Sequence, residues 1–193
     1  MKISSIRLTL YCLSIILISC LAFFLVSNAL EIMVFSGDLF YHSIQFWRVL
    51  TFPFIHISLS HLTQNIVAIL VITFLAYEVD LGARAYLGSF FTVSIFIALV
   101  TGLIVSHMTI AGLSMGIYAI MGAVAIKGSN FIPKSIIIPL FAVSLIIEPL
   151  ASSFDIAVIK STIFHLLGFV FGMVFIITTK KIIIKKKVLA YAG

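Results

Sequence analysis

Six long apolar segments, separated by short polar stretches, take up most of the chain. They cover residues 8–29, 58–77, 85–106, 112–127, 134–150 and 158–179. A helix of about 20 apolar residues spans the ~30 Å hydrocarbon core of a bilayer. With 63% hydrophobic and 9% charged residues, the chain is more apolar than a soluble domain can bury. Because lipid-exposed backbone must be satisfied within its own segment, the sequence predicts an all-α polytopic membrane protein, a six-helix bundle forming one domain, 1–193.

The distribution of basic residues predicts how these helices are oriented. With six spans, both termini lie on the same side of the membrane. If that side is cytoplasmic, ten of the twelve Lys and Arg residues are inside, and Arg48 and Lys160 are outside. The inner residues are Lys2, Arg7, Arg84, Lys127 and Lys134, followed in the basic tail 180–193 by Lys180, Lys181, Lys185, Lys186 and Lys187. The positive-inside rule then predicts an N-in, C-in topology.

The net charge of +6 has two explanations, nucleic acid or membrane. Because the lysines gather at the predicted membrane edges, attraction to anionic lipid and orientation of the chain explain this charge better. Membrane lipid is therefore an expected partner, and nucleic acid is not.

The first span and the connection after it need separate treatment. The first apolar run is longer than a signal-peptide core and ends at no clear cleavage site, so we expect it to be retained as a helix. The outer connection, residues 30–57, is long and rich in aromatic side chains. We expect it to fold back partly into the membrane interface, where Trp and Tyr are favourable.

Several polar side chains fall at membrane depth in alternate spans. Spans two, four and six all run from outside to inside, so residues early in each share the outer leaflet. They are His61 and Asn65 in span two, with His56 just before it, Ser114 and Tyr118 in span four, and His165 in span six. Polar groups are costly in lipid, which makes such residues candidates for function.

Taken singly, each of these residues has a structural explanation. Ser114, two residues after Gly112, is a good helix N-cap, and His165 can bridge two helices. His61 and Asn65, at i,i+4 on one face, can join helices by hydrogen bonding. Taken together, they are the parts needed for attack on a carbonyl: a hydroxyl, a base and donors for an oxyanion.

The surroundings of the candidate base favour a dyad. No carboxylate is expected within the span beside His165, so a pair with Ser114 fits better than a triad. Gly168 lies one turn below His165 on the same face and leaves room for a neighbouring backbone. Tyr118 lies one turn below Ser114, where its ring could stack on an imidazole.

These residues, in this order, resemble the rhomboid family of intramembrane serine proteases. The motifs that carry the resemblance are Trp47-Arg48, His56, His61-x-x-x-Asn65, Glu78-x-x-x-Gly82, Gly112-Leu113-Ser114 with Tyr118 and Gly122, and His165-x-x-Gly168-x-x-x-Gly172. No single motif is specific, but the ordered set is. The resemblance runs from Trp47 onward and is to the basic six-helix bacterial type.

The resemblance implies a function and a role for each site residue. Ser114 would be the nucleophile and His165 the general base, while His61, Asn65 and the Ser114 backbone N–H would form the oxyanion hole. The supporting residues would be Tyr118, His56, Gly112 and Gly168. It further implies single-pass transmembrane proteins as substrates, a multi-pass location in a bacterial inner membrane, and no metal or cofactor.

The fourth and fifth spans suggest how a substrate would enter. The fourth span rises only ~24 Å, which places Ser114 roughly 10 Å below the outer surface, at the floor of a water-filled cavity. We expect the fifth span to act as a movable wall, because Pro139 and Pro149 weaken its helix.

One residue departs from the family pattern. Members usually carry glycine directly after the nucleophile, and this chain has Met115. We expect its side chain either to push the fourth and sixth helices apart or to fill part of the substrate pocket. Two other functions stay open. One is a weakly active or inactive relative that binds transmembrane clients. The other is a small transporter, although this chain has no acidic residue predicted at mid-membrane to relay protons.

Overall fold

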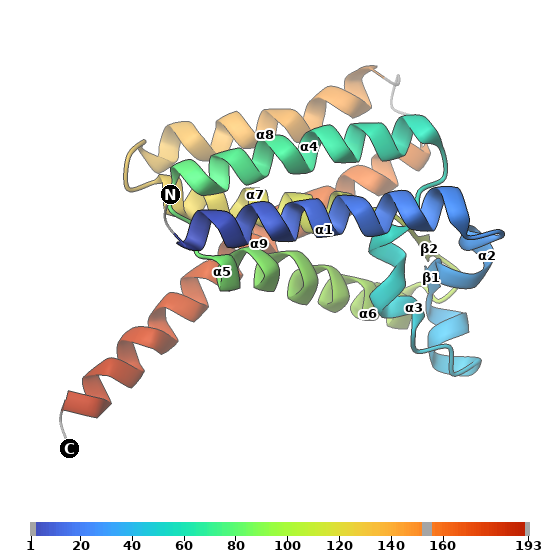
Figure 1. Cartoon of the computed structure of the whole chain (residues 1–193), viewed down its shortest axis with the longest axis horizontal. Coiled ribbons are helices and arrows are strands. Elements are labelled where there is room, and N and C mark those ends of the chain that lie inside the picture. The colour runs from blue at the N-terminus through green and yellow to red at the C-terminus, as the bar shows by residue number, and fades with distance from the viewer. Residues whose placement is uncertain (1–2, 152–155, 192–193) are drawn as a thin grey trace.

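The computed structural model describes residues 3–151 and 156–191, with side chains over 6–145 and 158–180. Pro149, Lys2 and the tail lysines beyond Lys180 lie outside the described side chains. The main helices are α1 Ile3–Leu25, α4 Leu59–Glu78, α5 Ala83–Gly88, α6 Ser94–Ile104, α7 Ser114–Gly128, α8 Lys134–Ala151 and α9 Ile156–Tyr191. The π-helical turn η3, Ser89–Val93, joins α5 to α6 in one continuous run. Figure 1 shows these helices as a bundle.

The prediction of a mostly helical chain is confirmed, and each predicted apolar segment coincides with a helix or a continuous helical run. Within the described residues, four helices are long and apolar enough to cross a membrane, at Ile6–Leu25, Leu59–Glu78, Ala83–Ile104 and Val158–Lys180. Shorter apolar helices occupy Ser114–Gly128 and Lys134–Leu145. The six-span topology therefore stays a prediction.

Three helix ends differ by more than two residues from their predicted positions, and the first is the start of α1, which lies at Ile3 instead of residue 8. The first helix ends at Leu25 instead of 29, because Asn28 adopts a left-handed conformation (φ 58°) that starts the short helix α2, Ala29–Met33. The last helix runs to Tyr191 instead of 179. Its basic tail contains no Gly or Pro before Gly193 and is rich in Ile, Lys and Leu, so nothing in its sequence stops the helix. In Figure 1 this end of α9 extends away from the bundle.

Helix α7 forms the centre of the bundle, with ten of its residues buried. Its small side chains let α9 approach closely. A Cβ added at Gly168 would lie 2.7 Å from the backbone oxygen of Met115, and one added at Gly172 would collide with the backbone of Ala119. The reverse contact is made by Gly122, where a Cβ would collide with the backbone of Phe169. Backbone contact of this kind fixes the register of α9 against α7.

The connection between α1 and α4 is itself folded. Besides α2 it contains β1 Phe35–Ser36, the π-helical turn η1 Asp38–His42, α3 Arg48–Thr51 and the 3-10 turn η2 Phe52–Phe54. The guanidinium of Arg48 is 5% exposed and donates hydrogen bonds to the backbone oxygens of Val34 (2.8 Å) and Glu31 (2.6 Å) and to the side chain of Gln45 (2.6 Å). Arg48 therefore joins separate parts of the connection between α1 and α4 by hydrogen bonds.

This connection is also tied to the chain just before α7. Strand β1 pairs antiparallel with β2, Thr109–Ile110, and the Asp38 N–H donates to the Ser106 carbonyl at 3.0 Å. In Figure 1 both strands lie at the end of the bundle opposite the two chain termini. The two-residue strands are too short to leave an alternating pattern in the sequence, and they were not predicted.

Candidate active site

Ser114 is the first residue of α7, and a special backbone turn places it there. Gly112 has φ 104°, a conformation that side chains rarely adopt, and its N–H donates to the Phe52 carbonyl at 2.9 Å. The turn links η2 to the start of α7. The first N–H groups of a helix have no partner within it and carry a partial positive charge. The backbone at Ser114 is therefore suited to stabilise a negative charge.

His165 lies on α9, on the side of this helix that packs against α7. Its ring stacks on Tyr118, with centroids 4.5 Å apart and planes 19° from parallel. Both side chains are half-buried. Because Gly168 lets α9 touch the Met115 carbonyl, the imidazole is held at the level of the first turn of α7.

Ser114 and His165 line the same cavity, of about 390 Å³. Besides Met115 in α7, its other lining residues come from the segment that precedes α7 and from the first turns of α9, among them His107, Lys160 and Phe164. A second cavity of about 400 Å³ lies between α4, α7 and α8 and is lined by Asn65, Ser114 and Tyr118 together with Phe141 and Ser144. Ser114 therefore lies between the two cavities.

The donors predicted in span two lie at the start of α4. The Ser58 hydroxyl caps this helix by accepting the His61 N–H at 3.1 Å, and the Asn65 amide donates to the His61 carbonyl at 3.0 Å. A Cβ added at Gly112 would lie 2.9 Å from the His61 ring and 3.8 Å from the Asn65 amide nitrogen. Both side chains thus reach the turn that leads into Ser114.

His56 stands behind His61, with ring centroids 5.1 Å apart and an edge-to-face arrangement. Its Nδ1 lies 3.2 Å from the Phe54 carbonyl, while its buried Nε2 has no hydrogen-bond partner within the described residues. Burial, and then the neighbouring His61, lower the pKa of His56 to about 4. His56 is therefore neutral at pH 7 and supports His61 by ring contact.

Met115 does not separate α7 from α9, so that expectation is wrong. Its side chain is 2% exposed and packs in an apolar cluster with Phe35, Phe52 and Ala119. The two helices stay in contact because Gly168 presents no side chain to the Met115 carbonyl. Met115 nevertheless lines the cavity that holds Ser114, which agrees with the other expectation, that it fills part of the pocket.

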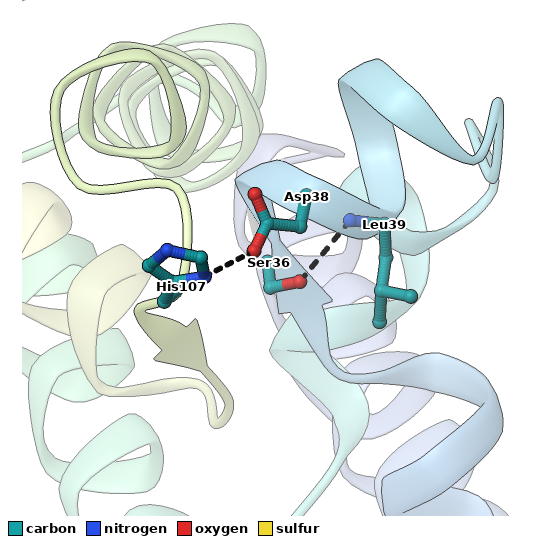
Figure 2. Close-up of polar contacts among 4 residues, drawn as sticks. All are labelled: Ser36, Asp38, Leu39 and His107. Carbon is teal, nitrogen blue, oxygen red and sulfur yellow. Dashed lines mark hydrogen bonds and ion pairs between the residues drawn. The ribbon is translucent and has the colours of Figure 1, made fainter.

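The rim of this cavity carries an ion pair that sequence reasoning missed (Figure 2). Asp38 Oδ2 lies 2.5 Å from Nδ1 of His107, and the Leu39 N–H donates to the Ser36 hydroxyl at 3.3 Å. A hydrogen bond from Ser106, then the charges of His107 and His42, hold the pKa of Asp38 below its usual value. The two partners come from separate connections, and no sequence pattern links them.

Within the described residues, no group of three or more His, Cys, Asp or Glu side chains is arranged to hold a metal ion. The candidate site is therefore built from a hydroxyl, imidazoles, an amide and backbone donors. Its chemistry depends on these groups and on the two cavities around Ser114.

Comparison with known families identifies the group of proteins to which the chain belongs. A family model described as Rhomboid domain matches residues 43–182, nearly three quarters of the chain and the part that holds every candidate site residue. No curated protein matches the chain at the significance required. The family consists generally of intramembrane serine proteases, and its match together with the apolar helices indicates a multi-pass membrane protein. The resemblance found in the sequence is thus confirmed: the chain belongs to the rhomboid family.

Proposed function

We propose that this protein is an intramembrane serine endopeptidase that cleaves single-pass transmembrane proteins through a dyad of Ser114 and His165. The observation that carries the proposal is that both side chains line one cavity, while the His165 ring is stacked on Tyr118. Stacking limits rotation of the imidazole, which is the orienting role that a third, acidic residue plays in a triad.

Each chemical step has a residue suited to it. His165 takes the proton from the Ser114 hydroxyl as the oxygen attacks the scissile carbonyl. The Ser114 N–H, His61 and Asn65 stabilise the resulting oxyanion. His165 then gives the proton to the leaving amine. In the second half of the reaction water attacks the acyl-enzyme, His165 takes a proton from this water, and the proton returns to the Ser114 oxygen as it leaves. Both cavities beside Ser114 are needed, one for water and one for the peptide.

We place substrate entry between α4 and α8. The cavity lined by Asn65, Ser114, Phe141 and Ser144 lies between these helices. A transmembrane substrate has its carbonyls hydrogen-bonded within its own helix, so it must unwind locally before Ser114 can attack. Helix α8 is continuous through Pro139, so this proline does not interrupt the helix as expected, and we propose that α8 moves away from α4 to admit the substrate.

A reversible crosslink tests this entry route. Cysteines at Val71 and Ser144, which line the same cavity, are joined by a disulfide-containing linker in a background that lacks Cys12 and Cys20. Cleavage of quenched fluorescent transmembrane peptides is expected to stop and to recover on reduction. Unchanged cleavage in the crosslinked protein refutes the route.

We also propose the six-span, N-in and C-in topology in a bacterial inner membrane. Both chain termini lie at the end of the bundle opposite β1 and β2 (Figure 1), as an even number of spans requires. The strong excess of Lys and Arg at that end supports a cytoplasmic position. Ser114 then faces the outer side.

Active-site labelling tests the catalytic proposal. A fluorophosphonate probe is expected to modify Ser114 in the folded wild-type protein and to leave His165→Ala and Ser114→Ala unlabelled. Ser161→Ala is the matched control, because Ser161 lines the same cavity but its hydroxyl donates to the Val158 carbonyl. Labelling that persists in His165→Ala refutes the choice of base.

A second function is favoured by Met115. This side chain lines the Ser114 cavity at a position where relatives usually carry glycine, and a narrowed cavity suits a protein that holds transmembrane clients without cutting them. In that case the folded protein is not labelled, and Met115→Gly is expected to restore labelling. Labelling of the wild type excludes this alternative.

A further inference from the structure

We propose that a groove between α6 and α9 binds one anionic phospholipid, with an acyl chain along the groove and the phosphate at Lys160. The groove has a volume of about 510 Å³. Its lining includes Thr101, Ile104, Val105, Ile163, Phe164 and Leu167, together with His107, Met108 and Lys160. The site is separate from the proposed catalysis and does not depend on it.

The groove is amphipathic along its length, as a phospholipid is. Lys160 and Leu167 mark its two ends on α9, about 10 Å apart along the helix axis. On the other wall Ile104 is 77% exposed, and Ile163 on α9 is 51% exposed. Exposed apolar side chains of this size, in a chain that spans a membrane, contact lipid tails. A cation at one end of such a groove selects the head group.

Among the basic residues predicted at this end of the bundle, Lys160 lines the groove directly. Arg48, the other predicted outer cation, is buried and bonded to the first connecting segment. His107 is paired with Asp38 (Figure 2), so its charge is already matched when it is protonated. Within the described residues, no carboxylate forms an ion pair with Lys160. The ammonium group of Lys160 has the charge and the position in the groove to bind a lipid phosphate.

The groove adjoins the cavity that holds Ser114 and His165. Four residues line both this groove and the cavity that holds Ser114 and His165, namely His107, Met108, Lys160 and Phe164. A bound lipid therefore forms part of the wall of that cavity on the side away from α4 and α8.

Quenching of tryptophan fluorescence by brominated lipid tests the proposal. The chain has a single tryptophan, Trp47, so Trp47→Phe provides a silent background. Ile104→Trp then reports on the groove. The matched lipid-facing control is Phe24→Trp, because Phe24 is 64% exposed and lies near the C-terminal end of α1. Each protein is placed in phosphatidylcholine vesicles that contain equal fractions of brominated phosphatidylglycerol or brominated phosphatidylcholine.

The expected result is about a fivefold preference for phosphatidylglycerol at Ile104→Trp, the factor that one basic residue provides near a membrane surface. Lys160→Arg should keep this preference and Lys160→Gln should abolish it, while Phe24→Trp shows none. Equal quenching by both lipids at Ile104→Trp, or a preference that survives Lys160→Gln, overturns the proposal.

Native mass spectrometry provides a second measurement that needs no reporter. Wild-type protein released from a mixture of the two lipids should retain phosphatidylglycerol, and Lys160→Gln should retain both lipids equally. Adducts that show no preference in the wild type contradict the proposal, even where a tryptophan variant fails to fold.

Discussion

At the scale of single residues, Gly112 controls how Ser114 is presented. Its φ of 104° and its contact with the His61 ring both exclude a side chain. Gly82 offers the opposite case, because it has φ −64° and a Cβ there meets nothing within 4 Å. Comparing alanine at the two positions therefore distinguishes a specific requirement for glycine at 112 from a general effect of replacing glycine by alanine.

Gly112→Ala is expected to destabilise the protein by about 1–3 kcal/mol, the usual cost of a strained backbone conformation, and to reduce fluorophosphonate labelling of Ser114. Gly82→Ala should change neither property. Thermal unfolding in detergent and labelling rates measure both variants. A Gly112→Ala protein that unfolds and labels like the wild type contradicts our account of the turn.

At the scale of elements, the contact between α7 and α9 places the serine and the histidine on one cavity. A Cβ at Gly172 would collide with the Ala119 backbone, so Gly172→Ala must shift α9 away from α7. We expect a loss of about 1–3 kcal/mol, as for other overpacked positions. Val170→Ala, on the same helix but 40% exposed, is the control and should be nearly neutral. Equal unfolding midpoints for the two variants would show that α9 tolerates displacement.

The pairing of β1 with β2 should respond to acid through Asp38. Because the pKa of this carboxyl is lower in the folded protein than in the unfolded chain, its ion pair stabilises the folded state above the unfolded pKa and is lost as the pH falls through the lower folded value. The protection of the β1–β2 amides against hydrogen exchange, relative to their intrinsic rate at each pH, is therefore expected to fall in acid in the wild type. In Asp38→Asn this protection should already be lower at neutral pH and change less with pH, and identical protection profiles refute the link.

At the scale of the whole molecule, topology decides whether the proposed function is possible. Cysteines at Lys160 and Lys134, in a background without Cys12 and Cys20, are expected to react with an impermeant maleimide from opposite faces of the membrane. The residue at 160 should be labelled in intact cells and the residue at 134 only after permeabilisation. Labelling of both from one side would rule out the six-span arrangement.

The sequence alone was sufficient to predict the helical segments and the family of this protein. The helical segments follow from local hydropathy, which adds up along a continuous stretch of chain. The ordered motifs from Trp47 to Gly172 were sufficient for the family, because the order of several residues is specific where one residue is not.

Tertiary structure decided what depends on residues distant in the chain. Neither the β1–β2 pairing nor the contact between Asp38 and His107 has a local signal, since each joins two connections that only the packed bundle brings together. The position of Met115 was also left open, because a helix position shows which face a side chain occupies and not how closely its neighbour approaches. Here the missing side chain of Gly168 allows that approach, while the Met115 side chain packs in an apolar cluster that also includes Phe164 and Leu167 of α9.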